Sequence, residues 1–312
     1  MKKIITYLTT HIRSDFNLIL YLAVASLLAI TITFNYIYDF EDSIIDAYYG
    51  QEIRFVWYFL FYAFAYYSTV LIMSLIKRNT QMLTNTLFWL YSLVAIVIMS
   101  FDGGFHYHYT YTHEGDFPAE LSDYAFRCLS NLNSLLTVFL PLFLFYKYKD
   151  TQQNGFYGLS AKASDLKPYA WMLLIMLPLI TWASFQPDFL DSYPSYKDSG
   201  ADEFLHVPEW ATALFFELAY GLDFIATELL FRGFLVIGMV HILGKDAILP
   251  MVVTYAFLHF GKPLGETIGS VFGGYILGIV ALYSRNIWGG VAIHLGVAWL
   301  MELTAFMQML RQ

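Results

Sequence analysis

One apolar stretch of the chain carries a carboxylate and a guanidinium four residues apart. Glu228 and Arg232 lie in the sequence Thr-Glu-Leu-Leu-Phe-Arg-Gly, residues 227–233. On a helix, residues i and i+4 share a face, so these two side chains can pair. Ionisable residues inside an apolar span are costly and mark a functional site by default. The pair predicts either a catalytic carboxylate held by an arginine or a structural lock within the membrane.

Two histidines follow in separate apolar segments. His259 ends the sequence Tyr-Ala-Phe-Leu-His, and His294 lies in the last apolar segment, 287–309. With a helical rise of about 1.5 Å per residue, Glu228, His259 and His294 lie about 19, 17 and 10 Å from the inner ends of their segments. These depths are compatible with one buried site in the inner half to the middle of a membrane.

A glutamate and two imidazoles in a dry pocket suit general acid–base chemistry. Burial raises the pKa of a carboxyl group and lowers that of an imidazole. Such a set could deprotonate a water and stabilise an oxyanion, and it requires no cofactor. Glutamate with two histidines is also a zinc-binding set. A divalent metal held by Glu228, His259 and His294 is therefore the alternative, and no HExxH-type spacing selects it.

The composition indicates where these groups reside. The chain has 312 residues, of which 58% are hydrophobic and 13% charged, whereas a soluble domain has about 25% charged residues. The net charge is −8 and no block of Lys and Arg is present, which excludes a nucleic-acid partner of the basic-patch kind. We expect an integral, multi-pass membrane protein whose surroundings are the lipid bilayer.

The positioning elements are membrane-spanning helices. A helix needs about 20 apolar residues to cross the hydrocarbon core, and lipid offers no partner for unpaired backbone groups. The predicted fold class is all-α, a polytopic transmembrane helical bundle of about eight or nine spans. The candidate spans are 16–38, 53–76, 84–101, 124–146, 168–185, 211–240, 247–260, 267–284 and 287–309. We expect the shortest, 247–260, to stop within the protein.

The charges of the connecting loops predict the orientation. Lys77 and Arg78, Lys245, and Arg285 lie in loops that alternate with acidic loops at 39–52, 102–123 and 186–209. Because basic residues favour the cytoplasmic side, we expect a cytoplasmic N-terminus and an outer C-terminus.

The chain divides into two regions of different character. Residues 1–205 form an N-terminal membrane region of about five spans with acidic outer loops, and residues 209–310 concentrate the intramembrane polar residues. The second region is rich in glycines at four-residue spacing, which favours close helix packing. Two stripes show this spacing: Gly265, Gly269 and Gly273, and Gly274 and Gly278.

At its polar residues the second region resembles the CPBP intramembrane proteases, which include the CAAX prenyl endopeptidases and the Abi group. That family has the ordered patterns Glu-Glu-x-x-x-Arg, Phe-x-x-x-His and His-x-x-x-Asn, and the corresponding stretches here are 227–232, 255–259 and 294–298. The resemblance implies hydrolysis of a peptide bond in a peptide or membrane-protein substrate. It also implies that Glu228 and His259 activate water, that His294 serves the oxyanion and that Arg232 fixes the glutamate helix.

Two positions depart from the family pattern. Thr227 replaces the first glutamate and Ala298 replaces the asparagine. Threonine is not a base at neutral pH, and the loss of one oxyanion donor costs about 10²–10³ in rate. Glu228 itself, or Asp223 one helical turn before Thr227, is a candidate replacement base. The alternative functions are a non-catalytic relative acting as a membrane scaffold or binding protein, and proton transport.

Other polar residues are expected to have structural roles. The loop that carries His106, His108 and His113 could bind zinc or copper, but its aromatic content favours an interfacial loop. Glu266 follows His259 at a helix start, where a carboxylate is favoured by the helix dipole. Glu302 lies nearer the outer end of the last span.

Overall fold

A computed structural model describes residues 2–150, 155–159 and 166–311, and every regular element in those ranges is a helix. The predicted all-α fold class is confirmed. The helices of the first half are α1 (Lys2–Asp15), α2 (Leu18–Tyr38), η1 (Glu41–Ile45), η2 (Asp46–Tyr48), α3 (Ile53–Lys77), α4 (Gln81–Thr84), α5 (Thr86–Gly104), α6 (Tyr107–Tyr109), η3 (Thr110–Glu114), α7 (Ala119–Ser134), η4 (Leu135–Phe139) and α8 (Leu140–Tyr148). The helices of the second half are α9 (Lys167–Ala183), α10 (Pro187–Ser192), α11 (Ala201–Leu205), α12 (Glu209–Glu228), η5 (Leu229–Gly238), α13 (Val240–Leu243), η6 (Gly244–Ala247), α14 (Ile248–Phe257), α15 (Leu264–Ser284) and α16 (Trp288–Met309).

Seven helical stretches of the described residues are long and apolar enough to cross a membrane, and the shorter apolar helix α9 accompanies them. One of the seven, Glu209–Phe257, contains two of the predicted spans. The chain turns at Gly244, which has a positive φ of 60°, and α14 then packs back against η5. The prediction of a polytopic transmembrane bundle is confirmed, and the number of spans is close to the eight or nine expected.

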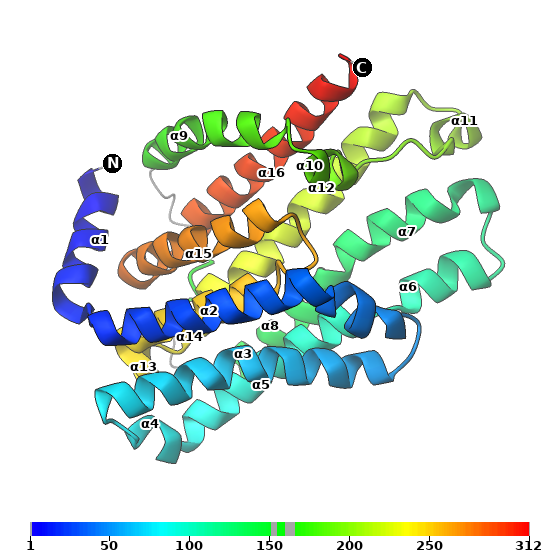
Figure 1. Ribbon diagram of the computed structural model, residues 1–312. Coiled ribbons are helices and arrows are strands. Elements are labelled where there is room, and N and C mark those ends of the chain that lie inside the picture. The colour runs from blue at the N-terminus through cyan, green and yellow to red at the C-terminus, as the bar shows by residue number, and fades with distance from the viewer. Residues whose placement is uncertain (1, 151–154, 160–165, 312) are drawn as a thin grey trace.

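Helix α14 is enclosed by its neighbours and lies behind α2 in the view of Figure 1. It contacts α3 on one side and α15 on the other, and all ten of its residues are buried. Helix α12 packs against α7, and α16 packs against α9. The part of the shortest predicted span that forms α14 is thus enclosed by protein on all sides.

The span predicted at 211–240 changes its winding directly after Glu228. It is α-helical up to Glu228 and continues as a π-helix to Gly238. Tyr157 lies against this segment, and a Cβ added at Gly233 would meet the Tyr157 carbonyl oxygen at 2.8 Å. Turns of π-helix occur frequently at functional sites.

The two glycine stripes of α15 differ in their surroundings. Gly274 and Gly278 lie against α14, where an added Cβ would come within 3.1 Å of the Tyr255 ring and 2.5 Å of the Met251 side chain. The prediction of close packing is correct for this stripe. It is wrong for the other stripe, because a Cβ on any of its glycines would meet no atom within 4 Å. Those glycines lie on a face of α15 that no helix of the described residues covers.

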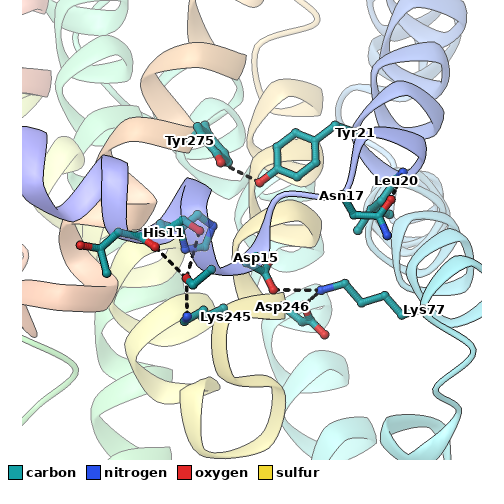
Figure 2. A network of polar contacts seen from close by, with 11 residues as sticks. His11, Asp15, Asn17, Leu20, Tyr21, Lys77, Lys245, Asp246 and Tyr275 are labelled. Carbon is teal, nitrogen blue, oxygen red and sulfur yellow. Dashed lines mark hydrogen bonds and ion pairs between the residues drawn. The ribbon is translucent and has the colours of Figure 1, made fainter.

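At one end of the bundle, polar contacts join the N-terminal helices to the second region (Figure 2). Lys77 of α3 lies 3.2 Å from Asp15 and forms a second ion pair with Asp246 in η6. The Tyr21 and Tyr275 hydroxyls are 2.6 Å apart and link α2 to α15. These contacts fix α1 and α2 against the helices that carry the candidate site.

Candidate active site

Glu228 is the most enclosed ionisable residue of the site. Its side chain is 0% exposed and that of Arg232 is 1% exposed. The Glu228 Oε1 atom lies 3.0 Å from Arg232 Nη1 and 3.3 Å from His294 Nδ1. One carboxylate oxygen therefore faces both the arginine on its own segment and a histidine of α16.

Gly290, in the first turn of α16, permits this approach. A Cβ at this position would lie 2.1 Å from Glu228 Oε2. Any side chain there would displace the carboxylate, because such a contact is far below van der Waals distance. The glycine thus allows a fully buried carboxylate to sit against the backbone of α16.

Tyr255 lies between the two histidines. Its hydroxyl is 3.3 Å from His294 Nε2, and its ring centroid is 4.5 Å from that of His259. The Arg232 guanidinium lies over the same ring, with Cζ 4.0 Å from the centroid. Tyr255 was not among the residues predicted for the site. The available signal was its position four residues before His259, a spacing that brings two side chains together on a helical segment.

His259 is held by the carbonyl of Tyr255. Its Nδ1 atom lies 2.8 Å from that oxygen, so Nδ1–H donates and Nε2 keeps its lone pair. No hydrogen bond or ion pair joins His259 to Glu228 or to His294 in the described part of the chain. Direct contacts therefore join Glu228, Arg232 and His294, whereas His259 approaches this group across Tyr255.

Several buried polar atoms of the site are close to one another but not aligned as hydrogen bonds. They are both carboxylate oxygens of Glu228, the three guanidinium nitrogens of Arg232 and Nδ1 of His294. Buried polar atoms in proteins are almost always paired, and each exception needs an explanation. Their unused capacity favours a polar ligand, such as a water molecule or a peptide group.

Of the predicted supporting residues, Arg232 contacts Glu228. Asp223 and Thr227 form no hydrogen bond or ion pair with Glu228 among the described residues, and the same holds for Ala298, which replaces the family asparagine. Asp223 interacts with Ser134 of α7 and lies within electrostatic range of Lys262. Thr227 is partly buried, and its hydroxyl has no hydrogen-bond partner among the described residues. Ala298 is buried on α16 one helical turn after His294, with 5% exposure. Neither Thr227 nor Ala298 supplies a hydrogen bond to the glutamate–histidine contact.

Glu266 and Glu302 accept hydrogen bonds from the segment that precedes α12. Glu302 accepts hydrogen bonds at 2.8 and 2.9 Å from the backbone N–H of Ser195, and Glu266 accepts one at 2.8 Å from the Tyr193 hydroxyl. These contacts agree with their expected structural roles. Both fix the segment before α12 against the ends of α15 and α16.

Potential metal ligands were predicted at two sets of residues. Among the described residues, three ligand atoms come within 4.8 Å of one another only at Glu41, Asp42 and Asp46. That cluster belongs to the acidic loop 39–52. In the aromatic loop, His113 instead pairs with Asp123 at 3.1 Å, and His106 contacts the Gly104 carbonyl at 3.2 Å.

The second region matches a known family. Residues 209–300 match the family model described as Type II CAAX prenyl endopeptidase Rce1-like. The resemblance to CAAX proteases is thereby confirmed for this segment. The segment contains all three motifs and makes up less than a third of the chain. No curated protein and no solved structure matches the chain.

Proposed function

We propose that the protein is an intramembrane endopeptidase that hydrolyses a peptide bond in a prenylated CAAX-type peptide or a membrane protein. The match of residues 209–300 to the Rce1-like family supports a CAAX-protease-like function. The observation that carries the proposal is the contact between the buried Glu228 carboxylate and the His294 imidazole. This arrangement places a base beside a hydrogen-bond donor within the membrane-spanning helices.

In this scheme Glu228 takes a proton from water while the water oxygen attacks the carbonyl carbon of the substrate. Arg232, 3.0 Å from the carboxylate, fixes its direction. His259, with Nδ1–H bound to the Tyr255 carbonyl, presents Nε2 to the same water. The proton then passes to the departing amine as the C–N bond breaks. The scheme needs no cofactor.

The oxyanion is served by His294 and by the Tyr255 hydroxyl beside it. The family asparagine is replaced by Ala298, whose side chain has no hydrogen-bond donor. The Tyr255 hydroxyl lies 3.3 Å from His294 Nε2, which brings a second O–H or N–H donor to the same place. Removal of one such donor typically costs about 10²–10³ in rate, so a replacement donor preserves activity.

A non-catalytic relative is the second candidate function. Thr227 and Ala298 favour it, because neither side chain can perform the chemistry of the family residue it replaces. In that case the ion pair between Glu228 and Arg232 locks α12 to η5, and the protein acts as a membrane scaffold or binding protein.

Reconstitution separates the two functions. The purified protein in liposomes is mixed with a prenylated peptide that ends in a CAAX sequence, and new peptide termini are detected by mass spectrometry. The unprenylated peptide provides the comparison. The proposal predicts cleavage of the prenylated peptide. Intact peptides in the presence of folded, helical protein would favour the scaffold or binding function.

A further inference from the structure

We infer that Asn35 and Tyr36 of α2 are positioning residues that hold the turn bearing His259. The turn comprises residues 258–263 and connects α14 to α15. The catalytic consequence rests on the proposed function, in which His259 contacts the reacting water. Helix α2 lies outside the segment that matches the Rce1-like family, so this support comes from a part of the chain that the match does not cover.

Asn35 binds the turn directly. Its side chain is 4% exposed, and Nδ2 donates to the Phe260 carbonyl at 3.0 Å. The other end of the same amide, Oδ1, accepts a hydrogen bond at 3.0 Å from the backbone N–H of Glu41. Because both ends of the amide are engaged, its orientation is fixed and its donor remains aimed at the turn.

Tyr36 binds the turn on the other side of Gly261. Its hydroxyl donates to the Lys262 carbonyl at 2.5 Å and lies 2.7 Å from the Thr267 hydroxyl. Thr267 in turn donates to the carbonyl of His259 itself. The carbonyls of His259, Phe260 and Lys262 are thus all held, two of them directly by α2.

Beside the turn the packing leaves a hollow, although Phe260 itself is buried against Phe61 and Phe257. A cavity of about 350 Å³ lies between α2, α3 and α14, and its lining includes Asn35, Phe257 and Phe260. Close-packed side chains would otherwise fix a backbone in place. Beside the cavity, the Glu41 carboxylate lies close to the turn. A Cβ at Gly261 would lie 2.6 Å from Glu41 Oε2. The hydrogen bonds from α2 therefore act together with the packing of Phe260 and the backbone bonds to α14 in holding the turn.

The turn and α14 together position the imidazole. The N–H and the ring of His259 bond back to the Ala256 and Tyr255 carbonyls of α14. The carbonyl of His259 lies beyond the end of that helix and is held by Thr267, which Tyr36 contacts. A misplacement of about 1 Å at a reacting group can cost about 10²-fold in rate. Loss of the α2 contacts should lower kcat without weakening the binding of substrate.

The test uses the full-length protein with two variants, Asn35→Leu and Tyr36→Phe. The control is Tyr38→Phe, three residues from Asn35 at an exposed position. Hydrogen–deuterium exchange of the amides of residues 258–262 is measured together with kcat and KM on the prenylated CAAX peptide. In both variants we expect amide exchange in the turn to rise about tenfold and kcat to fall about 10–100-fold, with KM unchanged. In Tyr38→Phe we expect wild-type exchange, kcat and KM.

The exchange measurement does not depend on activity, so it separates this inference from the proposed function. One outcome is that the wild-type protein cleaves nothing while amide exchange in the turn still rises in both variants. In that case Asn35 and Tyr36 do hold the turn, and the protease assignment fails. Unchanged amide exchange in both variants would overturn the inference that Asn35 and Tyr36 hold the turn, whatever the activity. A fall in kcat equal to that of Tyr38→Phe would also overturn it.

Discussion

The Oε1 atom of Glu228 lies 3.3 Å from the Nδ1 atom of His294, and the two residues come from different membrane-spanning helices, α12 and α16. A buried carboxylate without partners carries a desolvation penalty of several kcal/mol. Here the same oxygen also faces Arg232 at 3.0 Å. The same oxygen therefore has a guanidinium partner and an imidazole partner, and the second contact joins α12 to α16.

The approach of α16 to this carboxylate provides the first prediction. Gly290→Ala would place a methyl group 2.1 Å from Glu228 Oε2, so the carboxylate must leave its contact with His294. We expect at least a 100-fold loss of kcat on the prenylated peptide and a loss of about 1–3 kcal/mol in unfolding free energy.

Gly273→Ala is the matched control, because a Cβ at that glycine meets no atom within 4 Å. It lies within helix α15, where alanine is favoured over glycine by about 1 kcal/mol. This variant should keep wild-type kcat and unfold at an equal or higher temperature. Equal losses in the two variants would show that the effect at Gly290 is not specific to the carboxylate.

The Tyr255 hydroxyl provides the second prediction. Tyr255→Phe removes the group 3.3 Å from His294 Nε2 and leaves the aromatic ring against Arg232 and His259. A hydrogen bond of about 1–3 kcal/mol corresponds to a factor of about 5–150 in rate. We expect kcat to fall within that range while KM and the melting temperature change little. Wild-type kcat in this variant would exclude the hydroxyl from the oxyanion site.

The third prediction concerns Glu41 in the loop between α2 and α3. Burial, followed by the neighbouring Asp46 carboxylate, raises the pKa of Glu41 from 4.5 to about 7. The folded state therefore binds the proton more tightly than the unfolded state, and stability is lost as the pH rises from about 4.5 to 7. Each pKa unit corresponds to 1.36 kcal/mol, so the loss is at most about 3 kcal/mol.

Glu41→Gln mimics the neutral form, and its amide oxygen can still accept the hydrogen bond from Tyr58 that the carboxylate receives at 2.7 Å. The variant should unfold at a higher temperature than wild type at pH 8 and at the same temperature near pH 4.5. Glu114→Gln, at an exposed position, should not change the pH dependence. A variant that is less stable than wild type at pH 8 would contradict the raised pKa.

The fourth prediction concerns metals. Because the proposed scheme activates water with a carboxylate and a histidine, cleavage should persist after dialysis against EDTA and in the presence of 1,10-phenanthroline. Rates within about twofold of the untreated protein are expected. Loss of activity that added zinc restores would instead favour a metal at Glu228, His259 and His294.

Much of the site follows from spacing alone. The pairing of Glu228 with Arg232 follows from the i, i+4 rule. Depth counting along the apolar segments placed the glutamate and both histidines in one layer of the membrane, and the structure brings Glu228 into contact with His294. The spacing of charged loops and apolar segments likewise predicted an all-helical, multi-pass bundle.

The remaining features depend on which faces meet, and a single sequence does not specify this. Tyr255 belongs to an apolar helix, where an aromatic residue usually indicates packing. The stripe at Gly265, Gly269 and Gly273 has the spacing of a packing face, but no helix covers it. Asn35 and Tyr36 lie near the end of a predicted span, and only the tertiary structure shows that they bind the His259 turn.

If Glu228 is the base of a peptidase, Glu228→Gln removes the activity. The amide keeps the shape of the side chain but cannot accept a proton at neutral pH. Initial rates on the prenylated CAAX peptide are compared with those of Glu217→Gln, a variant of the same helix α12 at a residue that contacts neither histidine. The account predicts no detectable cleavage by the folded Glu228→Gln protein and wild-type rates for Glu217→Gln. Cleavage by Glu228→Gln at the wild-type rate would contradict it.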